Sequence, residues 1–200
     1  MVDFESRVLF VLGGPGAGKG TQCAKICDNF PNWAHISAGD CLRAERNDPS
    51  SKDGELINSL IVDGKIVPVA ITVKLLMKAM EQKRQEGKTS FLIDGFPRNQ
   101  DNVSGWNDNV KGVKLLGVLY FTANEQELEK RLLSRGESSG RADDNLESIR
   151  KRFMTFEGES LPIVAAYERD DLVFTVDGMP PVEEVWANTE KIIQKFQELE

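Results

Sequence analysis

The sequence is short of histidine and cysteine and has no long apolar run. Its 200 residues include one histidine and three cysteines, and the cysteines are Cys23, Cys27 and Cys41. Three cysteines cannot all pair, and no two of them have the spacing typical of zinc knuckles, so we expect neither a disulfide scaffold nor structural zinc. No apolar stretch is long enough to span a membrane, and residues 1–7 carry acids where a secretion signal needs a basic and then an apolar run. These absences predict a soluble, intracellular chain.

An excess of basic residues is also absent. The chain has 25 Lys and Arg against 32 Asp and Glu, which gives a formal net charge of -7. Nucleic acid and anionic membranes repel such a chain at long range, so we expect neither as a partner. With 40% hydrophobic and 28% charged residues, the chain has enough apolar material for one compact domain over residues 1–200. Anions can still be bound locally.

The cysteines and the histidine are expected to be structural. Cys23 and Cys27 are four residues apart, which places them on one face of a helix, and packing is sufficient to explain this spacing. His35 lies in a short apolar segment with no cysteine or second histidine near it in the sequence. We therefore expect His35 to support the structure rather than to bind a metal.

Short apolar runs alternate with amphipathic stretches along the chain, which is typical of β-α units and a mainly parallel sheet. The pattern predicts a three-layer α/β sandwich with a five-stranded parallel sheet flanked by helices. The small and polar stretches 47–54 and 136–145 are expected to be loops. The expected strands are 8–12, 33–36, 91–93, 115–121 and 172–176, and the expected helical windows are 19–29, 55–63, 70–86, 125–135, 145–168 and 182–197.

A glycine-rich segment directly follows the first expected strand. Residues 13–21 read GGPGAGKGT and precede a helix-compatible run, which is the context that a phosphate-binding loop requires. The glycines let successive N–H groups converge on phosphate oxygens, the helix N-terminus adds partial positive charge, and Lys19 reaches the terminal phosphates. Gly20 follows Lys19 and Thr21 comes one residue later, which puts in question the usual direct contact between a hydroxyl and magnesium.

This variant of the loop resembles the nucleoside monophosphate kinases of the adenylate kinase superfamily. The GTPases, the other broad class with such a loop, add Asn-Lys-x-Asp and Asp-x-x-Gly, and neither string occurs in this chain. The resemblance implies a P-loop fold with a core of residues 1–36, 74–134 and 146–200, an acceptor-binding insertion at 37–73 and a lid at 135–145. It implies an ATP site formed by Gly14, Pro15, Gly16, Ala17, Gly18, Lys19, Gly20, Thr21, Arg131, Arg135 and Pro180.

Two further motifs resemble the acceptor region of the same superfamily. Residues 37–43 read SAGDCLR after the second strand, and residues 94–98 read DGFPR at the end of the third, where strand ends in open parallel sheets converge on ligands. Asp94 lies where a carboxylate would orient magnesium-bound water, so Mg²⁺ is expected to arrive with ATP and to bind no side chain directly. The resemblance implies an acceptor site formed by Ser37, Gly39, Asp40, Arg43, Lys65, Ile66, Val67, Gly95, Phe96, Pro97, Arg98, Asn99, Asn102, Arg141 and Arg152.

Two positions bear on the base of the acceptor. In adenylate kinases a Thr stands between the Ser and the Gly of the first motif, and the second motif continues Phe-Pro-Arg-Thr-x-x-Gln. This chain has Ala38 at the first position and Asn99 and Asn102 in the second motif, which resembles the eukaryotic UMP-CMP kinases. An amide carries both a donor and an acceptor, so it can face uracil or cytosine by flipping. The resemblance implies UMP, CMP and dCMP as acceptors; an adenylate kinase acting on AMP and a non-catalytic nucleotide-binding module remain alternatives.

An arginine-rich stretch resembles the lid of this superfamily. Five residues separate Arg135 from Arg141, which is typical of the short lid that carries no zinc. The resemblance implies that Arg131 stacks on the donor adenine, and we expect Asp143 and Asp144 to anchor the lid. We interpret Arg150 and Lys151 as part of a solvent-exposed helix face, with Glu147 paired to Lys151.

The implied activity is reversible phosphoryl transfer from MgATP to pyrimidine nucleoside monophosphates, by a monomer in the cytoplasm and the nucleus. Such transfer needs in-line geometry and neutralised charge rather than a nucleophilic side chain. The expected catalytic residues are Lys19, Asp94, Arg98, Arg135, Arg141 and Arg152.

Overall fold

A computed structural model describes residues 6–141 and 143–197 of the chain. Ala142 of the expected lid and the two ends of the expected core, residues 1–5 and 198–200, lie outside the described residues. Among the described residues, no helix combines the length and apolarity needed to cross a membrane.

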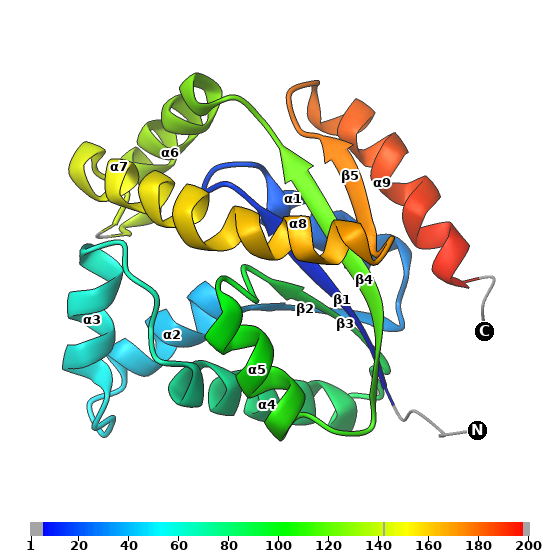
Figure 1. The fold of residues 1–200 in the computed structure, drawn as a ribbon, viewed down its shortest axis with the longest axis horizontal. Helices are drawn as coiled ribbons and strands as arrows, with labels where there is room; N and C mark the ends of the chain where they lie inside the picture. The colour runs from blue at the N-terminus through cyan, green and yellow to red at the C-terminus, as the bar shows by residue number, and fades with distance from the viewer. Residues whose placement is uncertain (1–5, 142, 198–200) are drawn as a thin grey trace.

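A five-stranded parallel sheet forms the centre of the fold, in the order β2-β3-β1-β4-β5 (Figure 1). This arrangement confirms the predicted fold class. The strands are β1 (Ser6–Gly13), β2 (Trp33–Ser37), β3 (Ser90–Asp94), β4 (Val113–Thr122) and β5 (Val173–Asp177). The helices are α1 (Lys19–Asn29), α2 (Ala38–Asn47), α3 (Gly54–Val62), α4 (Val69–Gln85), α5 (Gln100–Asn109), α6 (Glu125–Ser139), α7 (Leu146–Thr155), a π-helical segment η1 (Phe156–Ser160), α8 (Leu161–Arg169) and α9 (Val182–Gln197).

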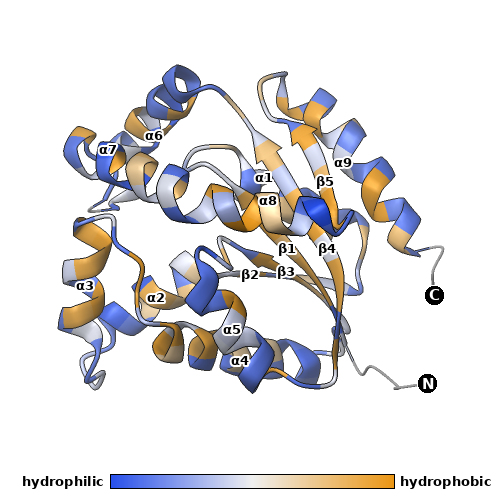
Figure 2. Ribbon diagram, viewed as in Figure 1, coloured by the Kyte–Doolittle hydropathy of each residue, from blue (hydrophilic) through white to orange (hydrophobic). Residues whose placement is uncertain are grey.

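Alternation along the strands separates two large cores. Leu9 and Val11 of β1 point into one core with α1, α6, α7 and α9, whereas Val8 and Phe10 point into the other with α4, α5 and α8. Successive side chains of a strand face opposite sides of a sheet, so a strand covered on both sides must be apolar throughout. The strands are accordingly among the most hydrophobic parts of the molecule, and much of the helical surface is polar (Figure 2).

A third and much smaller core lies within the expected acceptor-binding insertion. Leu42 of α2, Ile57 of α3 and Val67 before α4 form it, and each is at most 5% exposed. The insertion therefore has apolar packing of its own, apart from the two faces of the sheet.

The structure corrects three of the predicted element boundaries. Helix α5 falls in a segment for which no helix was predicted, α6 continues to Ser139 into the predicted loop 136–145, and the predicted helical window 145–168 divides into α7, η1 and α8. Residues 100–109 are rich in Asn, Asp, Ser and Gly, which have weak helix propensity. Packing stabilises α5 instead: Trp106 is 7% exposed in the second core, and a Cβ on Gly105 would lie 2.3 Å from Val69, so α5 and α4 approach closely there.

Candidate functional site

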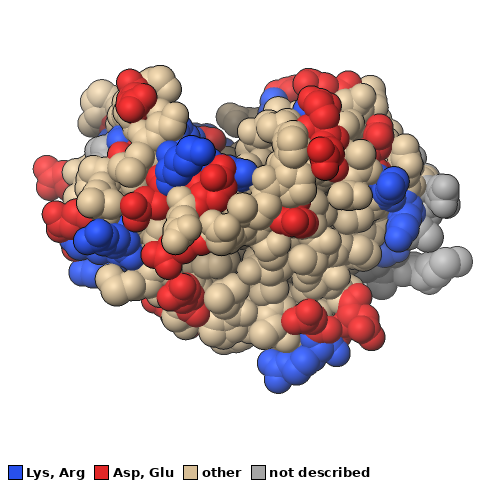
Figure 3. Space-filling model, turned by 90° about the horizontal axis from the view of Figure 1, so that it is seen from above, with Lys and Arg blue, Asp and Glu red and all other residues tan. Residues whose placement is uncertain are grey.

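A cavity of about 470 Å³ lies at the carboxyl ends of β1, β2 and β3. Its walls come from the glycine-rich loop, the first turn of α2, and the segment from α6 to η1. The volume is within the range typical of small-molecule sites. Elsewhere, basic and acidic side chains are interspersed over the face of the molecule shown in Figure 3, whereas the cavity is lined mainly by arginines and a lysine among its charged residues.

The glycine-rich loop connects β1 to α1 at the floor of this cavity. Gly16 and Gly18 have φ angles of +89° and +84°, in the left-handed region that favours glycine. A Cβ on Gly16 would also lie 2.8 Å from the Leu128 carbonyl oxygen of α6. Gly18 is the N-cap of α1 and provides no side-chain hydrogen bond to its first turn. The first N–H groups of α1 are therefore free of a side-chain cap and suited to an anionic ligand.

Lys19 is the first residue of α1, and its side chain folds back over the loop. Its Nζ donates hydrogen bonds to the carbonyl oxygens of Gly13 and Gly14 at 2.8 and 2.9 Å. Burial lowers the pKa of Lys19 from 10.5 to about 8; nearby Asp94 raises it, whereas Arg98 and Arg152 lower it further. Negative charge from a bound phosphate would raise this pKa and keep the ammonium protonated.

Asp94 ends β3 inside the cavity and is 8% exposed. Its Oδ2 lies 3.1 Å from His35 Nε2, so the carboxylate is held in one orientation. A buried carboxylate beside Lys19 and open to the cavity provides the oxygen chemistry that magnesium and its water shell require. The residues therefore fit the magnesium ion expected from the sequence.

Arg98 follows β3 and is enclosed by the cavity wall. Its Nε donates to the Gly95 carbonyl oxygen at 2.7 Å, and its backbone N–H donates to Asn102 Oδ1 at 3.1 Å. Burial and then the neighbouring Arg152 lower the pKa of Arg98 to about 10. It stays cationic at neutral pH, and a phosphate dianion would relieve the repulsion between these two arginines.

Asp40 on α2 links the expected insertion at 37–73 to the expected lid at 135–145. Arg43 Nη2 lies 2.6 Å from Asp40 Oδ1, and Arg141 Nη2 lies 3.2 Å from the same oxygen. Burial raises the pKa of Asp40, but the hydrogen bond and charge of Arg43, with Ser37 and Arg141, outweigh this effect and hold the pKa below its ordinary value. Two arginines from distant parts of the chain are thus brought to one carboxylate beside the cavity.

Two buried acids, Asp143 and Asp144, connect the expected lid segment 135–145 to α7. Arg135 donates to both carboxylate oxygens of Asp144 at 2.6 and 2.7 Å, and Arg152 Nη1 lies 2.8 Å from Asp143 and 3.2 Å from Asp144. The Asp144 side chain is fully buried. The predicted pair between Lys151 and Glu147 also forms, at 2.8 Å.

Most of the predicted site residues meet in this cavity. Arg131 does so from α6, where its Nη1 donates to the Gly178 carbonyl oxygen at 2.9 Å. The predicted residues that line the cavity are Pro15, Gly16, Ala17, Gly18, Lys19, Gly20, Thr21, Ser37, Gly39, Asp40, Arg43, Asp94, Gly95, Arg98, Arg131, Arg135, Arg141 and Arg152.

Other predicted residues do not line it. Asn99 caps α5 by accepting from the Asn102 N–H and donates to Glu159 at 3.1 Å, and Asn102 is 2% exposed. The remaining predicted residues outside the lining are Gly14, Lys65, Ile66, Val67, Phe96, Pro97 and Pro180.

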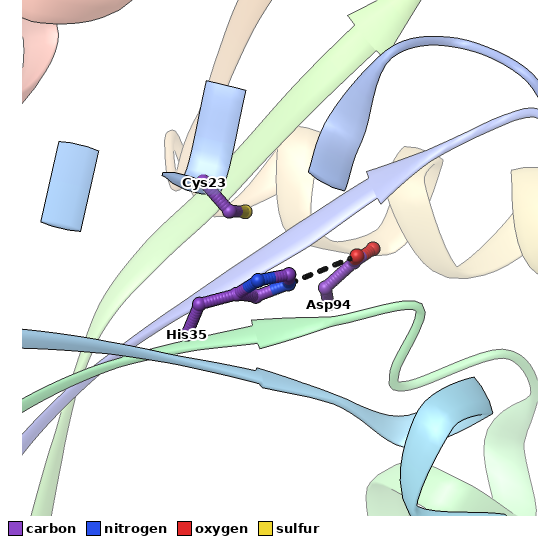
Figure 4. Close-up of side chains that lie close together, drawn as sticks. All are labelled: Cys23, His35 and Asp94. Carbon is purple, nitrogen blue, oxygen red and sulfur yellow. Dashed lines mark hydrogen bonds and ion pairs between the residues drawn. The ribbon is translucent and has the colours of Figure 1, made fainter. Parts of the chain in front are cut away.

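The cavity also contains residues that the sequence analysis did not identify. Ser160, at the end of η1, donates its hydroxyl to the Arg98 carbonyl oxygen at 3.0 Å, and Thr155 donates to the Gly64 carbonyl oxygen at 2.8 Å. His35 lies on the same face of β2 as Ser37, and this two-residue spacing could have revealed it. Although no cysteine is near His35 in the sequence, the fold places Cys23 of α1 among its neighbours in space (Figure 4).

Comparison with known proteins agrees with this geometry. The family model described as adenylate kinase matches residues 11–172. The chain is 50% identical over 192 residues to the UMP-CMP kinase of Danio rerio, covering 94% of this chain and 97% of that protein. It is 48% identical over 191 residues to the human UMP-CMP kinase, covering 94% of this chain and 97% of the human protein. It is 47% identical over 190 residues to the uridylate kinase of Schizosaccharomyces pombe, with 95% and 98% covered.

Proposed function

The chain belongs to the adenylate kinase family and transfers a phosphoryl group to nucleoside monophosphates, and we propose that its donor is MgATP and its acceptors are UMP, CMP and dCMP. One observation carries the phosphoryl chemistry: cationic side chains from the glycine-rich loop, α2, the segment after β3, α6, the proposed lid and α7 converge on one cavity beside a buried carboxylate. The choice of pyrimidines is supported by the sequence resemblance at Ala38 and Asn99, neither of which lines the cavity, and by relatives named UMP-CMP kinase and uridylate kinase.

The two nucleotides occupy opposite ends of the cavity in this proposal. ATP lies on the loop around Gly16 and Lys19 with its base near Arg131, and the acceptor lies near Arg43 and Arg98. Residues 37–73 and the lid at 135–145 close over them and exclude water, which would otherwise compete as acceptor. Hydrolysis of ATP without an acceptor is accordingly slow.

Charge neutralisation is the main task of the side chains. As the phosphoryl group moves, negative charge is shared among its oxygens and those of the donor and acceptor. Asp94 would hold the water shell of the magnesium ion that accompanies ATP, and that ion would supply part of this neutralisation. The rest is neutralised by Lys19, Arg98, Arg135, Arg141 and Arg152. No cysteine or histidine nucleophile is required, because the acceptor phosphate oxygen attacks directly.

Initial rates with UMP, CMP and AMP, at one concentration of MgATP, test the acceptor. We expect turnover of UMP and CMP to exceed that of AMP. A turnover rate with AMP equal to that with CMP would contradict the pyrimidine proposal. The absence of turnover with any acceptor would favour a non-catalytic module. Asn99→Thr keeps a residue that can cap α5, so a shift toward AMP in that variant would assign base selection to Asn99.

The chain is proposed to act as a monomer in pyrimidine nucleotide metabolism, in the cytoplasm and the nucleus. Its cysteines are free thiols, which suits a reducing compartment. Light scattering after size-exclusion chromatography measures the mass in solution. The mass of a dimer would contradict the proposal of a monomer. Imaging of the tagged protein in cells tests the compartment.

A further inference from the structure

Three side chains with different metal-binding atoms meet beside the cavity. Cys23 comes from α1, His35 from β2 and Asp94 from β3, and their thiol, imidazole and carboxylate point toward one another (Figure 4). One ligand atom from each lies within 4.8 Å of the other two. His35 is the single histidine of the sequence, so the one imidazole of the chain is next to a thiol and a carboxylate.

The core of the fold positions these three side chains. His35 pairs with Leu92 across β2 and β3, and Asp94 lies two residues beyond Leu92, so both side chains face the layer that contains α1. Cys23 is 0% exposed and packs in that layer. All three residues are therefore positioned by buried strands and a buried helix face rather than by a surface loop.

The geometry suits a small tetrahedral ion. His35 Nε2 and Asp94 Oδ2 are 3.1 Å apart, and two ligands bonded to one zinc at about 2.0–2.2 Å lie about 3.3 Å apart in tetrahedral geometry. Sulfur has to approach the other two atoms by a small side-chain movement. One sulfur, one nitrogen and one oxygen form a donor set that zinc accepts, whereas magnesium and calcium favour oxygen alone.

The site also has an entry path. His35 and Asp94 line the cavity, whereas Cys23 lies behind them. An ion entering through the cavity would meet the imidazole and the carboxylate first, and water or a phosphate oxygen could provide the fourth ligand.

We propose that Cys23, His35 and Asp94 bind a zinc-class divalent cation, and that this ion inhibits phosphoryl transfer by occupying Asp94. On binding, a bond forms between Sγ and the metal, the S–H bond breaks and its proton passes to solvent; no electron is transferred. Thiolate and carboxylate then balance the charge of the ion. Lys19 lies nearby, and its positive charge opposes the cation.

Cobalt(II) is the probe for binding, because cobalt bound to thiolate has a charge-transfer absorption band in the near ultraviolet. The metal-free protein is titrated with Co²⁺ alone, without nucleotide, in buffer that prevents thiol oxidation. We expect a band that saturates at one ion per chain, disappears in Cys23→Ser, and persists in the matched controls Cys27→Ser and Cys41→Ser. No band in the unsubstituted protein, or an equal band in Cys23→Ser, would overturn the site.

Two further measurements keep the result independent of folding defects in Cys23→Ser. His35→Gln should weaken Co²⁺ binding by about 10-fold or more, with circular dichroism to verify its fold. X-ray absorption of the unsubstituted protein loaded with one Zn²⁺ should show one sulfur neighbour among nitrogen and oxygen neighbours. A zinc shell without sulfur would contradict the proposal.

Inhibition is tested separately because it rests on the proposed function and binding does not. With MgATP and CMP present, free Zn²⁺ should inhibit transfer, and half-inhibition should need about 10-fold more zinc in Cys23→Ser. A cobalt band without zinc inhibition would overturn the inhibitory role alone. A cobalt band in a protein that transfers no phosphoryl group would overturn the proposed function and leave the metal site intact.

Discussion

At the scale of single residues, burial determines how the cavity is charged. Burial lowers the pKa of Lys19 and of Arg98, because removal from water disfavours the charged form. Asp144 shows the opposite outcome. Burial raises its pKa, but hydrogen bonds and charge from Arg135, and then the charge of Arg152, outweigh that effect and hold the pKa below 3.8.

Lys19 predicts uptake of a proton when ATP binds. With a pKa of about 8, part of the Lys19 population is neutral at a pH of about 8.5, and phosphate raises the pKa and recharges the amine. Calorimetry of ATP binding in two buffers of different ionisation enthalpy measures this uptake. Lys19→Met should take up less, and equal uptake in both proteins would contradict the assignment.

Arg141 predicts a large effect on the chemical step. If it meets the transferring group, Arg141→Ala should lower kcat by about 1,000-fold, the scale seen for arginines that neutralise such transition states. Arg150→Ala is the matched control, because Arg150 is exposed on α7, and it should leave kcat near normal. Steady-state rates of the two variants decide, and near-normal turnover of Arg141→Ala would remove Arg141 from the mechanism.

Asp144 predicts a pH-dependent contribution to stability. Asp144→Asn should lower the free energy of unfolding at neutral pH by about 1–3 kcal/mol, since Arg135 and Arg152 lose a buried anion. The pKa of Asp144 is lowered by folding, so its contribution is present above the ordinary pKa and is lost as pH falls through the lowered one.

Urea unfolding at pH 7 and at acidic pH measures the effect. The difference between Asp144→Asn and the unsubstituted protein should shrink as the pH falls. Asp63→Asn, which loses an exposed pair with Lys65, should change stability little. A difference for Asp144→Asn that stays constant with pH would contradict the assignment.

At the scale of elements, the local sequence pattern predicted those helices that form from local amphipathic periodicity. The windows 19–29 and 182–197 coincide with α1 and α9, because both have regular amphipathic periods. Motif spacing likewise identified the arginines of the cavity. Helix α5 could not be predicted this way, because it depends on packing against Val69. The π-helical segment η1 could not be predicted either, because its Ser160 donates a hydrogen bond to the carbonyl oxygen of Arg98, which is 62 residues away in the sequence.

The N-cap of helix α5 is expected to make a measurable contribution to stability. Asn99 accepts a hydrogen bond from the Asn102 N–H at 3.0 Å, so Asn99→Ala should lower the free energy of unfolding by about 1 kcal/mol. Asn99→Thr retains a capping oxygen and should lose less. Chemical denaturation of both variants tests this, and equal losses would show that the amide stabilises the fold through its bond to Glu159 instead.

At the scale of the whole molecule, stability is unevenly distributed. Two large cores cover the faces of the sheet, whereas the insertion has only a few buried apolar residues. Segments with few buried contacts open at lower free energy. We therefore expect the segment 37–73 to open while the sheet stays intact.

Hydrogen exchange tests this distribution. The amides of α3 should exchange faster than those of β1, which is buried and paired on both sides. Addition of ATP and CMP should slow exchange in α3 more than in β1. Equal protection of α3 and β1 without nucleotide would show that the insertion and the sheet open as one cooperative unit.

The position of Asp40 has a consequence for selectivity among anions. Its carboxylate accepts from both Arg43 and Arg141, so a phosphate that binds the same N–H groups competes with an anion that belongs to the protein. A singly charged ion such as chloride gains little by this exchange, whereas a phosphate dianion with several acceptor oxygens gains more. We therefore expect Asp40 to act as an internal competitor that small, singly charged anions do not displace from these two arginines.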